Sequence, residues 1–247
     1  MSKNIMSYGE LLNWLSILFL SALAYRYNDA YLPILFFWTM LIIIIGNARR
    51  IQTKKLSTYV FCVRRSMYVV PLFIVLLFNY DVNEVYDVSN ISLLTWLILG
   101  LTLGIITFLP KLNTWKIFLS EDFILLTSKK KAIDYLTMVY VLVGGAIGEE
   151  VFFRMFIIGS TLESSIKISI AISTFLFFLY HFGSKWSYKF EYYDYLVQIL
   201  FGILSGLLYF LSNSILPSIL AHLVYNSPHV ILNLKSYYVF YIKKGEC

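Results

Sequence analysis

Apolar runs of membrane-spanning length recur along the whole of this 247-residue chain. A helix needs roughly 20 predominantly apolar residues to cross the hydrocarbon core of a bilayer. Hydrophobic residues make up 59% of the sequence and charged residues only 14%, whereas about 25% of a typical soluble domain is charged. A soluble protein with so few charges could not cover its surface. The sequence therefore predicts an all-α fold, a polytopic membrane bundle.

Eight candidate spans can be placed along the sequence. They lie near residues 9–25, 30–47, 62–79, 91–109, 133–160, 166–182, 194–212 and 214–234. We predict a single membrane domain over residues 1–247, with an N-terminal four-helix part at 1–110 and a second part at 133–234. Residues 112–126 mix aromatic and charged side chains, which is typical of an amphipathic segment on the membrane surface and also of an ordinary loop.

The first apolar run ends with Ala22-Leu23-Ala24, which is similar to a signal-peptidase site. Glu10 and Asn13 interrupt this run, and further spans follow at once. We therefore expect an uncleaved first helix.

The formal net charge of +6 comes from Lys and Arg that lie mostly between the apolar runs. Basic stretches contain Arg49, Arg50, Lys54, Lys55, Arg64 and Arg65, then Lys111, Lys116, Lys129, Lys130 and Lys131, then Lys185 and Lys189, and finally Lys243 and Lys244. The intervening loop with Asp81, Glu84 and Asp87 has no Lys or Arg. This alternation is the positive-inside pattern, and with eight spans it predicts that both termini are cytoplasmic.

The basic stretches contain no recognisable nucleic-acid-reading motif, so we expect contact with anionic lipid headgroups and no nucleic-acid partner. The two cysteines, Cys62 and Cys247, form neither a CxxC pair nor a metal-ligand cluster. Their predicted position near a reducing compartment predicts that they form no disulfide.

Two glutamates and an arginine lie inside the fifth predicted span, in the sequence Gly148-Glu149-Glu150-Val151-Phe152-Phe153-Arg154. A charge within a span costs roughly 2.5–3.5 kcal/mol on insertion scales, so such residues usually serve a function. Glu150 and Arg154 are four residues apart and can pair on one helical face. Glu149 lies about 100° around the helix. An architectural ion pair would explain Glu150 and Arg154 but not Glu149, which we expect to face a cavity.

Two further groups place histidines on apolar helices. Phe177 and His181 share a face at the end of the sixth span, where a lone histidine is also a common interfacial residue. His222 and Asn226 are four residues apart in the eighth span and point the same way. Their side chains could donate to a shared ligand oxygen or simply connect neighbouring helices.

Three glycines, Gly144, Gly145 and Gly148, precede the glutamate pair and would allow close helix approach or a local bend. The sequence contains neither the HExxH motif of zinc metalloproteases nor the GxSxG motif of serine hydrolases. His229 has no partner at motif spacing, so we interpret it as structural.

The order and spacing of these groups resemble the CAAX-processing and bacteriocin-processing family, also called the Abi family, of intramembrane proteases. Its three motifs, EExxxR, FxxxH and HxxxN or HxxxD, correspond to Glu149-Glu150-xxx-Arg154, Phe177-xxx-His181 and His222-xxx-Asn226. The resemblance covers roughly residues 133–234 and identifies this part as a candidate catalytic core.

The resemblance implies that the chain hydrolyses a peptide bond in a water-filled chamber open to the cytoplasm. It implies that Glu149 is the general base on water, assisted by His181, and that His222 and Asn226 stabilise the oxyanion. Glu150 and Arg154 would hold these residues in place. The family's proposed mechanism needs no metal, and we expect no cofactor; the alternative is a zinc ion held by Glu149, His181 and His222.

Relatives in the family suggest a substrate class. Eukaryotic relatives cut prenylated C-terminal tails, and bacterial relatives are linked to bacteriocin maturation, self-immunity and peptide pheromones. The abundance of Ile, Lys, Asn, Tyr and Phe fits an AT-rich bacterial genome. We therefore expect a small membrane-associated or secreted peptide of the bacteriocin, pheromone or quorum-sensing type as substrate.

Two other function classes are compatible with the same residues. A non-catalytic immunity or regulatory membrane protein would bind a peptide or a sensor kinase with the same fold. A transporter would use Glu149, Glu150 and Arg154 as a proton or ion relay, but the sequence has no visible inverted repeat of the kind that many transporters contain.

Overall fold

The computed structural model describes residues 8–51, 57–77, 92–161, 165–182 and 191–243, and these residues are mostly helical. The helices in chain order are α1 (Tyr8–Arg26), α2 (Asn28–Arg50), α3 (Thr58–Ser66), α4 (Val70–Phe73), α5 (Leu93–Phe108), α6 (Leu112–Phe118), α7 (Glu121–Leu126), α8 (Ala132–Glu150), α9 (Gly159–Thr161), α10 (Ile166–Phe182), α11 (Tyr192–Ser212) and α12 (Leu216–Tyr237). Short 3-10 helices follow α4 and α5, and π-helical segments at Val151–Ile158 and Tyr238–Ile242 follow α8 and α12. The predicted all-α fold is confirmed.

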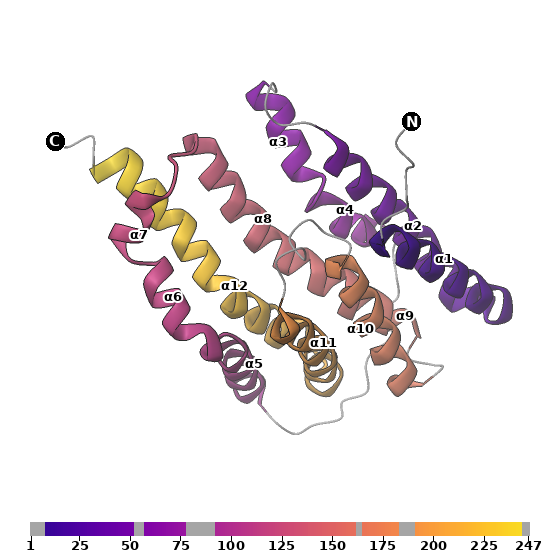
Figure 1. Ribbon diagram of the computed structural model, residues 1–247. Coiled ribbons are helices and arrows are strands. Elements are labelled where there is room, and N and C mark those ends of the chain that lie inside the picture. The colour runs from indigo at the N-terminus through magenta and orange to yellow at the C-terminus, as the bar shows by residue number, and fades with distance from the viewer. Residues whose placement is uncertain (1–7, 52–56, 78–91, 162–164, 183–190, 244–247) are drawn as a thin grey trace.

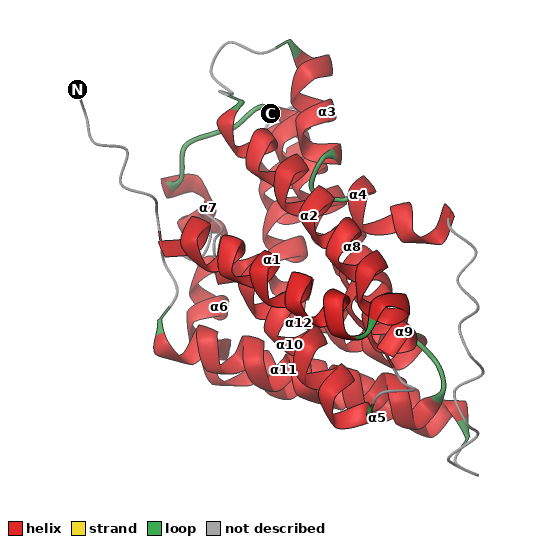
Figure 2. Cartoon of the chain, turned by 90° about the vertical axis from the view of Figure 1, so that its right-hand side faces the viewer, coloured by secondary structure: helices red, strands yellow, loops and turns green. Residues whose placement is uncertain are grey.

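The bundle places the N-terminal helices on one side and α5 with α12 on the other, with α8 and α10 between them (Figure 1). Figure 2, turned by 90°, shows the same helical bundle from the side. α1 and α2 pack as a hairpin, in which the Trp38 indole Nε1 donates a 2.8 Å hydrogen bond to Ser16 Oγ. Both side chains are buried. This bond satisfies a polar group that would be costly to leave unpaired in an apolar interior.

α12 makes its most extensive contacts with α8 and α5. On α5, Gly100 and Gly104 form a GxxxG pair that faces the backbone of α12: a methyl group added at Gly104 would lie 2.6 Å from the Ala221 carbonyl oxygen, and one at Gly100 would overlap the Pro217 carbonyl. Small residues at this spacing let helix backbones approach closely. The close approach fixes the position of α12 in the bundle.

The turn between α11 and α12 is short. Asn213 ends α11 in the left-handed region, with a φ of 50°, which asparagine tolerates better than most residues. Just beyond the turn, the Ser218 hydroxyl donates a 2.8 Å hydrogen bond to the Ser205 carbonyl on α11. The two helices are thereby connected near their shared end.

α8 continues directly into the π-helical segment Val151–Ile158. Segments of π-helix leave backbone groups without their usual α-helical partners and often occur at functional sites. One carbonyl of this segment, that of Phe153, accepts a 2.6 Å hydrogen bond from the buried Ser173 hydroxyl on α10. The fifth predicted span is therefore one continuous helical unit whose geometry changes immediately after the glutamate pair.

Two of the three glycines before the glutamate pair allow close packing, as predicted. Methyl groups added at Gly144 and Gly148 would lie 2.9 Å from Val69 Cγ1 and Leu72 Cβ, respectively, at the beginning of α4. A methyl group at Gly145 would meet only Glu149 Oε1, at 3.8 Å. α8 stays α-helical through these positions to Glu150, and the local bend stays a prediction.

Four helical stretches among the described residues are long and apolar enough to cross a bilayer: Tyr31–Ala48, Thr58–Leu77, Leu93–Phe118 and Tyr192–Ser212. Leu11–Arg26 and Ile166–Phe182 are apolar but shorter. α8 contains three carboxylates within its 19 residues, Asp134 near its start and the glutamate pair at its end. Length and composition therefore support a multi-pass membrane protein, while the count of eight spans stays a prediction.

The predicted amphipathic segment is helical, as α6 and α7, and packs on the C-terminal end of the bundle. The Lys235 ammonium donates to the Leu119 carbonyl at 2.7 Å, and Lys243 pairs with Glu121 at 2.6 Å. Ile117 and Leu126 are exposed. Its location on a membrane surface stays a prediction.

Other predictions fall partly or wholly outside the described residues. Cys247 and the charged stretches at 52–56, 78–91 and 183–190 lie there, while Cys62 is present as a free cysteine.

Candidate active site

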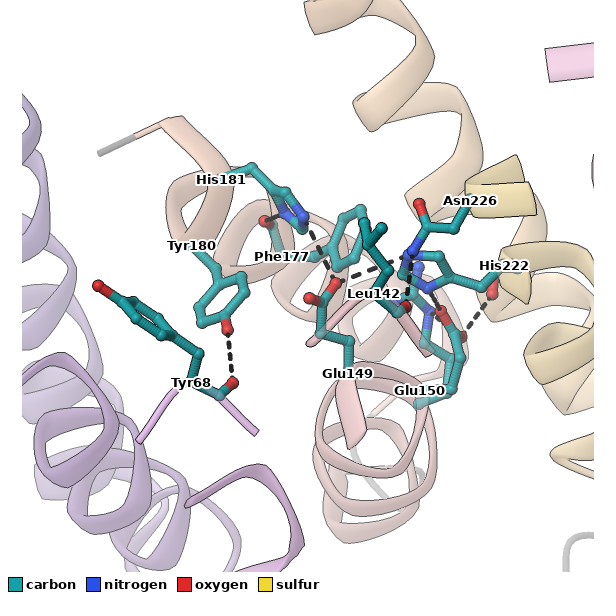
Figure 3. A network of polar contacts seen from close by, with 11 residues as sticks. Tyr68, Leu142, Glu149, Glu150, Phe177, Tyr180, His181, His222 and Asn226 are labelled. Carbon is teal, nitrogen blue, oxygen red and sulfur yellow. Dashed lines mark hydrogen bonds and ion pairs between the residues drawn. The ribbon is translucent and has the colours of Figure 1, made fainter. Parts of the chain in front are cut away.

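The Glu149 carboxylate contacts two imidazoles that come from different helices (Figure 3). Its Oε2 atom lies 3.4 Å from His181 Nε2 and 3.8 Å from His222 Nε2. Glu149 is near the end of α8, His181 is in the last turn of α10, and His222 is in the first half of α12. The three predicted site residues therefore meet at a single oxygen atom.

Both imidazoles present the same nitrogen to Glu149. His181 Nδ1 lies 3.0 Å from the Phe177 carbonyl one turn earlier on α10. A carbonyl oxygen only accepts hydrogen bonds, so Nδ1 is the donor and Nε2 faces the carboxylate. His222 Nδ1 lies 2.7 Å from Glu150 Oε1 in the same way. A hydrogen bond at the other ring nitrogen is the usual means of fixing which nitrogen of a histidine faces a reaction centre.

The two neighbouring glutamates differ in burial. Glu150 is fully buried, whereas Glu149 keeps 8% exposure, and the His181 side chain beside it keeps 21%. Among the described residues, Glu149 Oε2 has no hydrogen-bond donor. Glu149 is therefore the carboxylate that lies next to the partly exposed His181, with a buried Oε2 atom that lacks a donor.

Glu150 pairs with Arg154, as the four-residue spacing predicts. The Arg154 Nε atom lies 3.2 Å from Glu150 Oε2, and both side chains are fully buried. The same Oε2 accepts a 2.8 Å hydrogen bond from the Ser205 hydroxyl on α11. Glu150 thus joins the π-helical segment, α11 and α12 through three polar contacts, and such contacts offset the cost of burying a charge.

The Arg154 guanidinium lies over two aromatic rings. Its Cζ atom is 4.4 Å from the centroid of the Phe177 ring and 5.9 Å from that of Phe201. Within the described residues, its Nη1 and Nη2 atoms have no hydrogen-bond partner. The cation is therefore balanced by Glu150 on one edge and by π-electron density on its face.

Asn226 follows His222 by one turn and lies beside it in Figure 3. Its side-chain amide donates a 3.1 Å hydrogen bond to the Leu142 carbonyl on α8. An asparagine amide has two N–H groups, so this bond orients the side chain while the second N–H can serve a ligand. Five of the six predicted residues are thus connected by polar contacts, and Asn226 lies one turn beyond His222 with its amide bonded to α8.

Several residues that build the site were not identified from the sequence. Ser205, Ser218 and Phe201 each stand as single residues in apolar helices, and no motif indicates their role. The GxxxG pair of α5, Gly100 and Gly104, has a recognisable spacing and could have been identified as the surface against which α12 packs.

The alternative zinc site would need Glu149, His181 and His222 as its ligands. Among the residues that the structure describes, no group of three or more His, Cys, Asp or Glu side chains is arranged so that it could hold a metal ion.

His229, interpreted as structural, makes an edge-to-face contact with Trp115 on α6, with ring centroids 4.5 Å apart.

Comparison with known proteins identifies this part of the chain. No curated protein and no solved structure gives a significant match. Residues 131–228 match the model of the Rce1-like family, described as type II CAAX prenyl endopeptidase Rce1-like. The matched range contains every residue of the cluster around Glu149. Residues 131–228 are therefore a domain of the Rce1-like family of intramembrane peptide hydrolases, which lies within the CAAX-processing and bacteriocin-processing group.

Proposed function

We propose that this chain is an intramembrane endopeptidase in which Glu149 activates a water molecule to hydrolyse a peptide bond. The observation that carries the proposal is the meeting of Glu149 Oε2 with His181 Nε2 and His222 Nε2, at 3.4 and 3.8 Å. A general base must lie within hydrogen-bond reach of the proton that it removes. We place the attacking water beside His181, where it would supply the donor that the buried Glu149 Oε2 lacks among the described residues.

In the first step, Glu149 takes a proton from the water while the water oxygen attacks the scissile carbonyl carbon. His181 orients the water from the more exposed side of the site. The carbonyl oxygen becomes an oxyanion as the new C–O bond forms. Collapse of the tetrahedral intermediate breaks the C–N bond, and the proton on Glu149 passes to the leaving amine.

The donors that we assign to the oxyanion are the second N–H of Asn226 and the Nε2–H of a doubly protonated His222, whose Nδ1–H stays on Glu150. They lie one turn apart on α12, so one carbonyl oxygen can be reached from both. Donors held in place in a site that largely excludes water stabilise a developing charge more strongly than they would in bulk solvent. Glu150 and Arg154 hold His222 and α8 in register through the buried contacts described above.

We propose that the substrate is a small membrane-associated or secreted peptide or precursor, of the bacteriocin, pheromone or quorum-sensing type, in a bacterial cell. The low charge of the chain and the position of the site on apolar helices support a substrate that is itself associated with the bilayer. Comparative peptidomics of cells with wild-type protein or Glu149→Gln tests this. A peptide precursor should accumulate only in the variant, and Glu121→Gln, a change in an exposed ion pair away from the site, is the matched control.

We propose further that hydrolysis needs no metal. Chelation of purified protein in proteoliposomes should leave peptide hydrolysis unchanged. Activity that is lost on chelation and restored by zinc would instead favour Glu149, His181 and His222 as zinc ligands.

A further inference from the structure

Ser205 is a buried serine on α11 that contacts the site from outside the three motifs. Its side chain is fully buried, and its hydroxyl donates a 2.8 Å hydrogen bond to Glu150 Oε2. Its own backbone carbonyl accepts the hydrogen bond from Ser218 on α12. Ser205 therefore connects the helix after His181 to the carboxylate that holds His222.

The two oxygens of Glu150 are divided between different partners. Oε2 contacts Ser205 and Arg154 Nε, and Oε1 contacts His222 Nδ1 at 2.7 Å. This division is not the arrangement that an arginine usually adopts with a carboxylate, because a guanidinium tends to bind both oxygens in a fork. Here the Nη1 and Nη2 atoms of Arg154 have no hydrogen-bond partner among the described residues, so a competing forked arrangement is available to Glu150.

We propose that Ser205 is a positioning residue that keeps Glu150 bonded to His222, so that His222 presents Nε2 to the reaction centre. By donating to Oε2, Ser205 prevents the carboxylate from rotating onto the guanidinium and keeps Oε1 directed at His222 Nδ1. Without this bond, Glu150 forks onto Arg154, and the proton on His222 is no longer held at Nδ1. The inference rests on the proposed function only for its effect on catalysis.

Within the described part of the chain, no acidic side chain other than Glu150 contacts His222 Nδ1. The charged and titratable groups that face it are Glu149 and Glu150 from α8, Arg154 from the π-helical segment and, through Glu149, His181 from α10. Of these, only Glu150 contacts Nδ1, while Glu149 contacts Nε2. The protonation pattern of His222 is therefore a direct report on Glu150.

The chain contains only three histidines, so ¹⁵N-histidine NMR of the full protein in detergent micelles can follow His222. The wild type should show the signature of a protonated Nδ1 hydrogen-bonded to a carboxylate. Ser205→Ala should lose this signature, and kcat for peptide hydrolysis should fall roughly tenfold with KM unchanged, as expected for one hydrogen bond to a charged group. Ser169→Ala is the matched control, because Ser169 is equally buried but bonds only to backbone carbonyls; it should resemble the wild type in both readouts.

A second comparison tests whether Ser205 acts on His222 through Glu150. In a Glu150→Gln background, Ser205→Ala should cause no further change in the His222 signature, since coupled residues act non-additively. A wild-type His222 signature in Ser205→Ala, or a further change of equal size in the Glu150→Gln background, would overturn the inference. Full peptidase activity in Glu149→Gln would overturn the proposed function. It would not decide the role of Ser205, because the NMR signature of His222 does not depend on turnover.

Discussion

Glu149 and Glu150 are adjacent in the sequence, yet their surroundings in the structure suit different tasks. Glu150 is fully buried and has three polar partners, whereas Glu149 keeps 8% exposure and faces two imidazoles. The two oxygens of Glu150 are already engaged by Arg154, Ser205 and His222. In the proposed mechanism, Glu149 is the base and Glu150 anchors His222.

Replacement of Asn226 tests the assignment of the oxyanion donors at the residue scale. Asn226→Ala should lower kcat roughly 100-fold, because removing one oxyanion donor typically costs this much. KM should change little, since the lost interaction forms only in the transition state. Steady-state kinetics with the substrate peptide measures both constants. A change confined to KM would show that Asn226 binds the substrate instead.

Replacement of Arg154 tests its buried ion pair with Glu150. Arg154→Met should lower the free energy of unfolding by about 3–5 kcal/mol, because it leaves Glu150 as an uncompensated buried charge. The double variant Glu150→Gln/Arg154→Met should recover much of this loss. Thermal unfolding in detergent micelles checks both expectations. Equal stability of the single and double variants would argue against a direct pairing.

The residue-scale part of the site was predictable only where it depends on local spacing. The Glu150–Arg154 pair and the separate direction of Glu149 follow from helical geometry. Ser205 was not predictable, because serines in apolar helices commonly bond the carbonyl one turn earlier, as Ser212 and Ser160 do in this chain. Nothing in the sequence distinguishes a serine that bonds its own helix from one that reaches a neighbouring helix.

At the scale of elements, α12 carries His222 and Asn226, and α5 determines where α12 lies. Gly100 and Gly104 let the α5 backbone approach the Pro217 and Ala221 carbonyls. These contacts lie within two turns of His222 on the same helix. The position of two site residues therefore depends on a helix that has no chemistry of its own.

Gly104→Ala should lower the free energy of unfolding by about 1–3 kcal/mol, because the added methyl group forces the helices apart. It should also lower peptidase activity, since α12 moves with its contact surface. Gly46→Ala on α2 is the matched control, because an added methyl group there meets no atom within 4 Å. Unfolding midpoints in micelles and kcat measure the two effects. Equal behaviour of both variants would contradict the proposed role of the α5–α12 contact.

At the scale of the whole molecule, the recurring apolar runs and the low charge content together predicted the helical membrane fold. The count of spans was harder to predict for a physical reason. α8 carries the glutamate pair inside the bundle, and these carboxylates lower its hydropathy below that of a simple lipid-facing helix. The predicted site residues are therefore among those that make this span hard to recognise.

The predicted orientation, with both termini cytoplasmic, can be measured directly. A fluorescent reporter fused after Cys247 should be active, because such reporters fold in the cytoplasm, and alkaline phosphatase fused at the same position should be inactive. Fusions within residues 78–91, the loop without Lys or Arg, should give the reverse result. An active phosphatase at the C-terminus would contradict the positive-inside interpretation.

The central claim is that the Glu149 carboxylate is the base that activates water for peptide hydrolysis. The most direct test is kcat for cleavage of the identified peptide by purified Glu149→Gln in proteoliposomes, compared with wild type and Glu121→Gln. General base catalysis contributes 100-fold to 10,000-fold, so kcat of Glu149→Gln should fall by about 1,000-fold while Glu121→Gln keeps the wild-type rate. A Glu149→Gln variant that folds normally and cleaves within a few-fold of the wild-type rate would contradict the account.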